Sequence, residues 1–159
     1  MTGRRGQVSD QVKAHYENVG WEMDLEGVSQ DARHSEDLRE VAAEYASVTR
    51  FRVDSYVDDG AELLEVGTGP LQYPEYRLIH KKCSAVTIIE ISEIACKRLR
   101  EECPEGSVEI LNLDVFDYES EKRFDVILLQ HVLYHIYAPD QISLLGKLRK
   151  FLKPGGRIV

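Results

Sequence analysis

The sequence has few cysteines, no long apolar run and no apolar leader segment. Its three cysteines, Cys83, Cys96 and Cys103, are odd in number and form no C-x-x-C pair. This usage argues against a disulfide framework and a zinc site, and it predicts reduced thiols in a cytoplasmic protein. No apolar run is long enough to cross a membrane, and no apolar stretch follows Arg4 and Arg5 as it would in a signal peptide. We therefore expect no membrane partner.

The chain also has a deficit of positive charge. It contains 20 lysines and arginines against 28 aspartates and glutamates, which gives a formal net charge of −8. Because phosphate binding needs a basic surface, this balance argues against nucleic acid as a partner. What is present is a chain of 159 residues, 43% of them hydrophobic, which is enough to build one soluble domain with a real core.

The first 60 residues predict helices separated by irregular chain. The pattern predicts, in order, a flexible arm, a short helix, a loop or lid and a long helix, over residues 1–10, 9–17, 20–34 and 35–57. Ser35 is the expected N-cap of the long helix, and Trp21 is expected to anchor the loop to the body of the protein. We interpret residues 1–60 as an N-terminal helical cap or lid.

From Ala61 the pattern changes to short apolar runs that alternate with amphipathic stretches. The apolar runs predict strands at residues 61–66, 84–90, 107–113 and 124–129, with a fifth beginning at 156. The amphipathic stretches predict helices at 71–81, 93–102 and 139–152, the last with a stripe of Ile142, Leu145, Leu148 and Leu152. Near-continuous apolar strands suit a parallel sheet that is buried on both faces. Residues 61–159 are therefore expected to form a doubly wound α/β core, mostly parallel, with helices on both faces.

A turn with two glycines directly follows the first predicted strand. Gly67 and Gly69 have no Cβ, so a ligand can approach the backbone closely, and Pro70 suits the first turn of a helix. Free backbone N–H groups and the positive end of a helix dipole would meet a nucleotide-like ligand at such a turn. Two glycines alone are a weak signal, since any tight turn favours glycine.

Acidic residues at the ends of the next two strands strengthen this signal. Glu90 follows Gly69 by 21 residues. A carboxylate about 20 residues beyond such glycines is placed to accept hydrogen bonds from the two hydroxyls of a ribose. The third strand ends at Asp114, whose carboxylate could meet an adenine amino group, with Asp117 as the alternative. In such sheets ligands bind outside the carboxyl ends of the strands, which is where all these residues are expected.

In its motifs and their order, the chain resembles the class I, Rossmann-like methyltransferases that use S-adenosylmethionine. The matching pieces are Glu65-Val66-Gly67-Thr68-Gly69-Pro70, Glu90-Ile91-Ser92, Asn112-Leu113-Asp114, residues 124–135 and residues 148–159. Each piece is weak by itself, but five in order at the family's spacing form a strong signal. The resemblance covers roughly residues 12–159.

By that resemblance, the chain would bind the cofactor S-adenosyl-L-methionine, whose product is S-adenosyl-L-homocysteine. The residues that would contact the cofactor are Tyr16, Glu65, Gly67, Gly69, Glu90, Ile91, Asp114, Val115 and Gln130. Glu65 and the two glycines would hold its methionine end, and Glu90 its ribose hydroxyls. Asp114 would meet the adenine amino group, with Val115 or Phe116 against the ring.

The implied chemistry is an in-line displacement from a sulfonium, so the site mainly has to align two reactants and exclude water. Gln130 and His131 would line its floor, and Tyr16 would close over the cofactor. A general base is needed only if the acceptor has a proton to lose, and His131 is then the catalytic candidate. Two alternatives stay open: plain packing for Tyr16, and polar packing for His131.

Two features depart from the family's pattern. Leu71 stands where the family often has a third glycine. The sequence also ends inside the predicted fifth strand, where the family's fold continues with a helix and an antiparallel strand pair. Because an apolar edge strand is normally covered or paired, a homodimer through this edge is one hypothesis, and a truncated product or fragment is another.

The sequence thus favours an S-adenosylmethionine-dependent methyltransferase that acts on a small-molecule acceptor. The alternative from another class is a non-catalytic or truncated module that binds the cofactor and needs a partner chain. A nicotinamide-dependent dehydrogenase fits less well, because Gln72 occupies the third glycine position of its G-x-G-x-x-G pattern.

Overall fold

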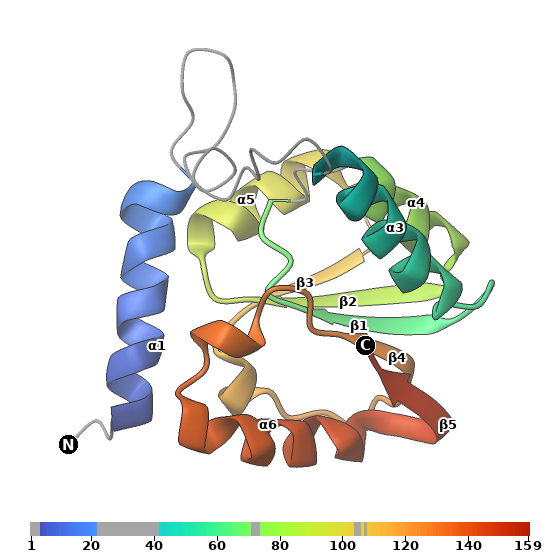
Figure 1. Cartoon of the computed structure of the whole chain (residues 1–159). Coiled ribbons are helices and arrows are strands. Elements are labelled where there is room, and N and C mark those ends of the chain that lie inside the picture. Colours follow the sequence, from blue (N-terminus) through green and yellow to red (C-terminus); the bar gives the residue numbers. More distant parts are fainter. Residues whose placement is uncertain (1–3, 22–41, 71–73, 104–105, 107) are drawn as a thin grey trace.

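The computed structural model describes residues 4–21, 42–70, 74–103, 106 and 108–159, and its centre is a five-stranded sheet (Figure 1). The strands are β1 (Glu62–Val66), β2 (Ala85–Glu90), β3 (Val108–Asn112), β4 (Phe124–Leu128) and β5 (Leu152–Ile158). Their order is β3-β2-β1-β4-β5, and all neighbouring strands are parallel. The order reverses between β1 and β4, at the switch point where ligands of such sheets bind. The predicted doubly wound fold is confirmed.

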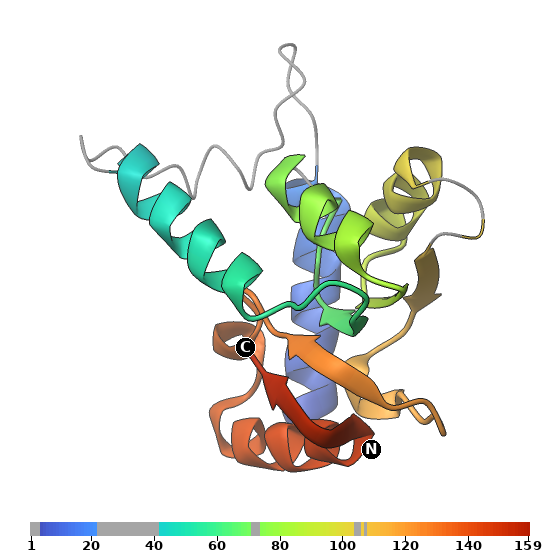
Figure 2. The same cartoon turned by 90° about the vertical axis from the view of Figure 1, so that its right-hand side faces the viewer.

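Helices cover both faces of the sheet (Figures 1 and 2). One face carries α3 (Ala42–Ser55), α4 (Pro74–Lys82) and α5 (Glu93–Glu102), and the other carries α6 (Gln141–Leu148). The layer under α3 to α5 includes Val53, Leu63, Ile79, Ile88, Leu99 and Val126. The layer against α6 includes Leu64, Ile89, Ile127, Leu144 and Leu148. Because successive strand residues point to opposite faces, the near-continuous apolar runs supply both layers.

The N-terminal segment corrects the sequence prediction. Helix α1 (Arg4–His15) begins inside the stretch that we expected to be a flexible arm, and a π-helical turn at Tyr16–Gly20 follows it. α1 stands across the carboxyl ends of the strands, where Arg5 and Lys13 help to line a cavity (Figure 1). The sequence of this helix is too polar to indicate its start, and the helix packs mainly against the π-helical turn that follows it and the 3-10 turn Leu133–His135.

Several other predictions fall outside the described residues. In the N-terminal segment these are most of the predicted loop and the N-cap at Ser35, and after the first strand it is Leu71 at the third glycine position. The long predicted helix is described from Ala42 and ends at Ser55, two residues before its predicted end.

The C-terminal strand also differs from its prediction. Residues 153–155 were expected to separate the helix at 139–152 from a strand that begins at 156, but they lie within β5 as an irregularity. Phe124 of β4 pairs with Leu152, whereas Val126 pairs with Arg157, so β5 carries extra residues between the two pairs. The strand therefore begins earlier than predicted, because a bulge lets a proline and two glycines be accommodated at the edge of a sheet.

The predicted stripe of helix α6 is confirmed in part: Leu148 is buried, Leu145 and Leu152 pack against the core, and Leu144 takes the place expected for Ile142. Leu144 and Leu148 are fully buried, whereas Ile142, which the prediction placed on the stripe, is 78% exposed. Ala138–Asp140 and Arg149–Phe151 at its two ends are 3-10 turns rather than parts of one continuous helix. The shorter helix turns its i, i+4 leucine pair toward the sheet, and this leaves Ile142 on the solvent side.

Two features of composition can be followed in the structure. Among the described residues, no helix combines the length and the apolar character that a membrane-spanning helix requires. The three cysteines are free thiols, and burial raises the pKa of Cys83 and of Cys96 to about 11. Thiols in this state are poor nucleophiles, so neither of these two cysteines is suited to chemistry near neutral pH.

Candidate cofactor site

The turn after β1 is built around two glycines. Gly67 and Gly69 have φ angles of 68° and 62°, in the left-handed region that residues with a Cβ rarely adopt. A Cβ added to Gly67 would lie 2.6 Å from Cγ2 of Val132, and one added to Gly69 would lie 2.7 Å from Cη2 of Trp21. The backbone angle and the available space therefore both require glycine at these positions.

Glu90, at the end of β2, accepts a hydrogen bond from the backbone of this turn. Its Oε2 accepts a hydrogen bond from the N–H of Gly69 at 2.9 Å, and its Oε1 accepts one from the N–H of Ser92 at 2.8 Å. Glu90 is 4% exposed. Burial raises its pKa, the N–H groups of Ser92, Gly69 and Ile91 oppose that rise, and the neighbouring Glu65 carboxylate adds to it. The residue predicted to bind ribose is thus held rigidly beside the glycines.

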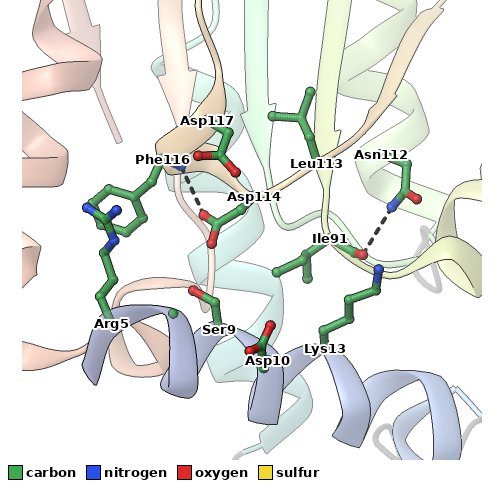
Figure 3. A pocket seen from close by; sticks show the side chains of 11 residues that line it. Arg5, Ser9, Asp10, Lys13, Ile91, Asn112, Leu113, Asp114, Phe116 and Asp117 are labelled. Atoms are coloured by element: carbon green, nitrogen blue, oxygen red, sulfur yellow. Dashed lines mark hydrogen bonds between the residues drawn. The ribbon is translucent and has the colours of Figure 1, made fainter. Parts of the chain in front are cut away.

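A cavity of about 280 Å³ lies between α1 and the ends of β2 and β3 (Figure 3). From α1, its lining includes Arg5, Ser9, Asp10 and Lys13. From the segments after the strands, it includes Ile91, Asn112, Leu113, Asp114, Phe116 and Asp117. Two predicted cofactor contacts, Ile91 and Asp114, therefore line the same cavity, and so does Asp117, the alternative to Asp114. The side chains facing it mix apolar surface with carboxylates, as recognition of a heterocyclic base requires.

The residues after β3 separate into one core residue and two that face the cavity. Oδ1 of Asp114 accepts a hydrogen bond from the N–H of Phe116 at 2.9 Å and so caps the 3-10 turn Val115–Asp117. Val115 is 6% exposed and packs into the core, whereas Phe116 lines the cavity. The guanidinium carbon of Arg5 lies 4.7 Å from the centroid of the Phe116 ring, a cation–π distance. Of the two candidates for the adenine ring, Phe116 is the one on the cavity wall.

Aromatic side chains from the N-terminal segment cover the glycine turn. The ring of Tyr16 stacks on Trp21 with a centroid distance of 4.8 Å, and its hydroxyl lies 2.8 Å from Nε2 of His135. Trp21 is 8% exposed and packs against Gly69, and Arg98 of α5 donates a hydrogen bond to its carbonyl oxygen at 2.6 Å. This placement agrees with the anchoring role expected for Trp21. Tyr16 itself lies on the π-helical turn rather than on α1, and through Trp21 it adjoins the glycine turn.

The end of β4, next to β1, carries the other predicted residues. Gln130 follows the strand, and His131 has a φ of 56°. A positive φ at a residue with a Cβ costs about 1–2 kcal/mol and is found most often at functional sites. The exposed His131 ring lies 6.5 Å from the Tyr134 ring, edge to face. His131 therefore lies exposed, two residues after Leu129, at the carboxyl end of β4.

One contact at the site was missed by the sequence analysis. Nε2 of His80, on α4, lies 2.6 Å from Oε2 of Glu65, and the two side chains are 8% and 5% exposed. The sequence gives no signal for this pair, because a single histidine on a helix has no characteristic spacing. Only the packing of α4 on the sheet reveals that His80 reaches the strand before the glycine turn.

The polar atoms around the turn fit a bound S-adenosylmethionine. Nε1 of Trp21, Oγ1 of Thr68 and Nε2 of Gln130 are buried and have no hydrogen-bond partner within the described part of the chain. Buried polar groups are normally paired, so unpaired ones gathered at a switch point are typical of a site whose ligand supplies the partners.

The comparison with protein families agrees with this chemistry. The family model that describes a "Methyltransferase domain" matches residues 64–158. Nodulation protein S of Rhizobium tropici is 30% identical over 101 residues, which are 62% of this chain and 42% of that protein. The chain therefore spans less than half the length of this curated relative.

Solved structures share the fold. The DhpI-SAM-HEP complex superposes with a TM-score of 0.67 at 17% identity and covers 99% of this chain and 66% of the solved one. The N-methyltransferase NodS from Bradyrhizobium japonicum WM9, in complex with S-adenosyl-l-homocysteine, superposes with a TM-score of 0.60 at 19% identity. That match covers 77% of this chain and 62% of NodS. At these identities the likeness establishes a common architecture.

Proposed function

The chain belongs to the methyltransferase domain family, and from this premise we propose that it binds S-adenosylmethionine and transfers the methyl group to a small-molecule acceptor. The observation that supports the proposal most directly is the hydrogen bond that the N–H of Gly69 donates to Glu90. This hydrogen bond joins the predicted ribose site to the glycine turn. Membership in the family leaves no reason to pursue the dehydrogenase alternative.

In this proposal the cofactor extends from the cavity to the glycine turn. Ile91, Asp114 and Phe116 would surround the adenine, with Val115 supporting Phe116 from the core. Glu90 would accept hydrogen bonds from the ribose hydroxyls.

The methionine end would then lie over the turn itself. Gly67, Gly69 and Glu65 would line it, and Gln130 would approach from β4 with its unpaired Nε2. When bound, the cofactor supplies an electrophilic methyl group on a sulfonium. The chain's own residues orient that group and exclude water from it.

For the acceptor we propose a small amine. The support is the printed activity of the solved relative NodS, an N-methyltransferase, together with the acidic charge of this chain. An ammonium acceptor has to lose a proton before its nitrogen can attack. His131, exposed at the edge of the site and held at a positive φ, is the proposed base.

We also propose that, of the N-terminal segment predicted as a cap over residues 1–60, the part at residues 4–21 covers the site, whereas α3 packs on a face of the sheet. The contacts that support this role are the Tyr16–His135 hydrogen bond and the packing of Trp21 on Gly69.

A homodimer through the edge of β5 remains our hypothesis for assembly, because β5 is an end strand of the sheet. Light scattering on the purified chain over a range of concentrations tests it, and a monomer throughout would refute it.

Calorimetric titration with S-adenosylhomocysteine tests the proposed function. We expect saturable binding by the wild-type chain and loss of most affinity in Glu90→Ala, because a ribose diol then has no carboxylate to bind. Glu101→Ala, at an exposed position on α5, is the matched control and should bind as the wild type does. No binding by a folded wild-type chain would refute the proposal.

Turnover separates an enzyme from a binding module. The proposal predicts methylated product from amines in a panel of amine, alcohol, thiol and carbon acid acceptors. Binding without turnover on any acceptor would favour the alternative of a non-catalytic module that needs a partner chain.

A further inference from the structure

Glu65 is a buried carboxylate that needs a compensating partner. It lies two residues before Gly67 and is 4% exposed, on the side of β1 that faces α4 and α5. Burying a carboxylate is costly unless hydrogen bonds or an opposite charge replace the lost water. Glu90, the second buried acid of the site, meets this need with two backbone N–H groups.

Glu65 meets the same need through a side chain. Among the described residues, His80 is the one hydrogen-bond partner of the Glu65 carboxylate, at 2.6 Å from Oε2. Because a carboxylate only accepts hydrogen bonds, Nε2 of His80 carries the proton in this contact. The other oxygen, Oε1, has no partner within the described ranges and can accept a hydrogen bond from a ligand.

We propose that His80 is a positioning residue of the cofactor site, which fixes the orientation of Glu65 through a hydrogen bond to its carboxylate. Glu65 is the residue expected at the methionine end, so this inference rests on the proposed function. His80 itself lies on α4 behind the strand, with its side chain 8% exposed, and acts through Glu65.

The two buried acids of the site are held by different partners. The Glu65 carboxylate contributes, after burial itself, to the raised pKa of Glu90, so the two side chains interact through space. The hydrogen bond from His80 keeps the Glu65 side chain in one orientation beside the glycine turn. Without His80, the buried Glu65 side chain would lose its hydrogen-bond donor and with it that orientation.

Two substitutions separate the hydrogen bond from simple packing. The amide introduced by His80→Gln can still donate to Glu65, whereas His80→Ala removes the donor. We expect His80→Ala to weaken S-adenosylhomocysteine binding about ten-fold or more, as for loss of a hydrogen bond to a charged group, and His80→Gln to recover most of that loss. Lys81→Ala, at the exposed neighbouring position, is the control.

Calorimetry and thermal unfolding without ligand give the two readouts. A purely structural role predicts that both His80 variants lower the unfolding temperature while the affinity stays at the wild-type value, and that result would overturn the proposal. Equal weakening in His80→Ala and His80→Gln would overturn it as well, because the hydrogen bond would not be the cause. If the wild-type chain does not bind S-adenosylhomocysteine, the proposed function fails first.

A double-mutant cycle keeps the proposal testable if His80→Ala does not fold. Glu65→Gln removes the carboxylate to which His80 donates, so the variant carrying both changes has no buried carboxylate without a donor. If His80 acts through Glu65, adding His80→Ala to Glu65→Gln leaves the affinity unchanged. A further loss of affinity in the double variant would show that His80 acts by another route.

Discussion

The two ends of the sheet carry cavities of the same size, about 280 Å³ each, and differ in how their polar groups are paired. At the amino end, Asp58, Asp59 and Asp125 face Arg157 and the glycines of β5. Arg157 lies 3.4 Å from Asp58, and Lys153 lies 2.8 Å from Asp125. The charges there balance one another in contact with solvent.

At the carboxyl end, polar groups are buried, and several are unpaired. Glu90 is bonded to the backbone of the turn, while Trp21 Nε1, Thr68 Oγ1 and Gln130 Nε2 have no partner within the described part of the chain. Cavity size therefore does not distinguish the two ends of the sheet. The buried, unpaired polar groups of the segments around the glycine turn do, since folding alone would not favour them.

The largest effect is expected from a Cβ in the glycine turn. Gly69→Ala combines a positive φ with a contact of 2.7 Å to the buried Trp21 ring, so we expect about 2–4 kcal/mol of lost stability and no detectable S-adenosylhomocysteine binding. Gly60→Ala, at the other cavity, has a φ of 81° but nothing within 4 Å of the added Cβ. It should cost about 1–2 kcal/mol for the backbone alone and leave binding intact. Urea unfolding measures the stability of both variants, and calorimetry measures their affinity for S-adenosylhomocysteine. Equal losses of stability in Gly69→Ala and Gly60→Ala would contradict the comparison.

The next effect is a difference in pH dependence between the two ends. Burial raises the pKa of Glu90, so this group favours the folded state at low pH, and that contribution is lost as pH rises through its folded pKa. The protonated acid has fewer acceptor sites for a ribose, so ligand affinity should fall on acidification before an ordinary glutamate, with its pKa near 4.5, would titrate. Glu90→Gln should weaken binding and flatten this dependence, as measured by calorimetry across a pH series.

Asp125 should behave in the opposite way. The N–H of Glu62 and the Lys153 ammonium hold its pKa below the usual 3.8. Its contribution to stability is present above the unfolded pKa and is lost as pH falls through the folded one. Asp125→Asn should therefore remove stability at neutral pH without changing ligand affinity. An affinity that follows Asp125 and not Glu90 would reverse our assignment of the site.

A smaller effect is expected from the wall of the cofactor cavity. Arg5→Ala removes the cation–π contact with Phe116, which is worth about 0.5–1 kcal/mol at an exposed position. We expect a loss of S-adenosylhomocysteine affinity of a few-fold, measured by calorimetry. Gln7→Ala, exposed on the same helix, serves as the control, and equal affinities of the two variants would contradict a role for Arg5.

The smallest effect is expected from the paired charges at the amino end. The side chains of Asp58 and Arg157 are 76% and 44% exposed, so solvent screens their interaction. Asp58→Asn should change the free energy of unfolding by less than about 0.5 kcal/mol and leave the affinity unchanged. A loss of binding in this variant would mean that the amino end takes part in the function.

The sequence predicted most of the features that depend on local residue patterns. The apolar runs located the first four strands because burial on both faces of a sheet demands them, and the 21-residue spacing located Glu90 opposite Gly69. The start of α1, the place of Ile142 on the α6 stripe and the start of β5 were predicted wrongly. Each depends on how the element packs in the folded chain, and a single sequence does not display such packing.

By itself, the sequence determined the doubly wound fold, the glycine turn and the acids at the strand ends, because each depends on residue type and spacing along the chain. Only the tertiary structure decided that Phe116 rather than Val115 faces the cavity, that Trp21 packs on Gly69 and that His80 pairs with Glu65. These contacts join segments that are distant in sequence, and they exist only once the helices have packed against the sheet.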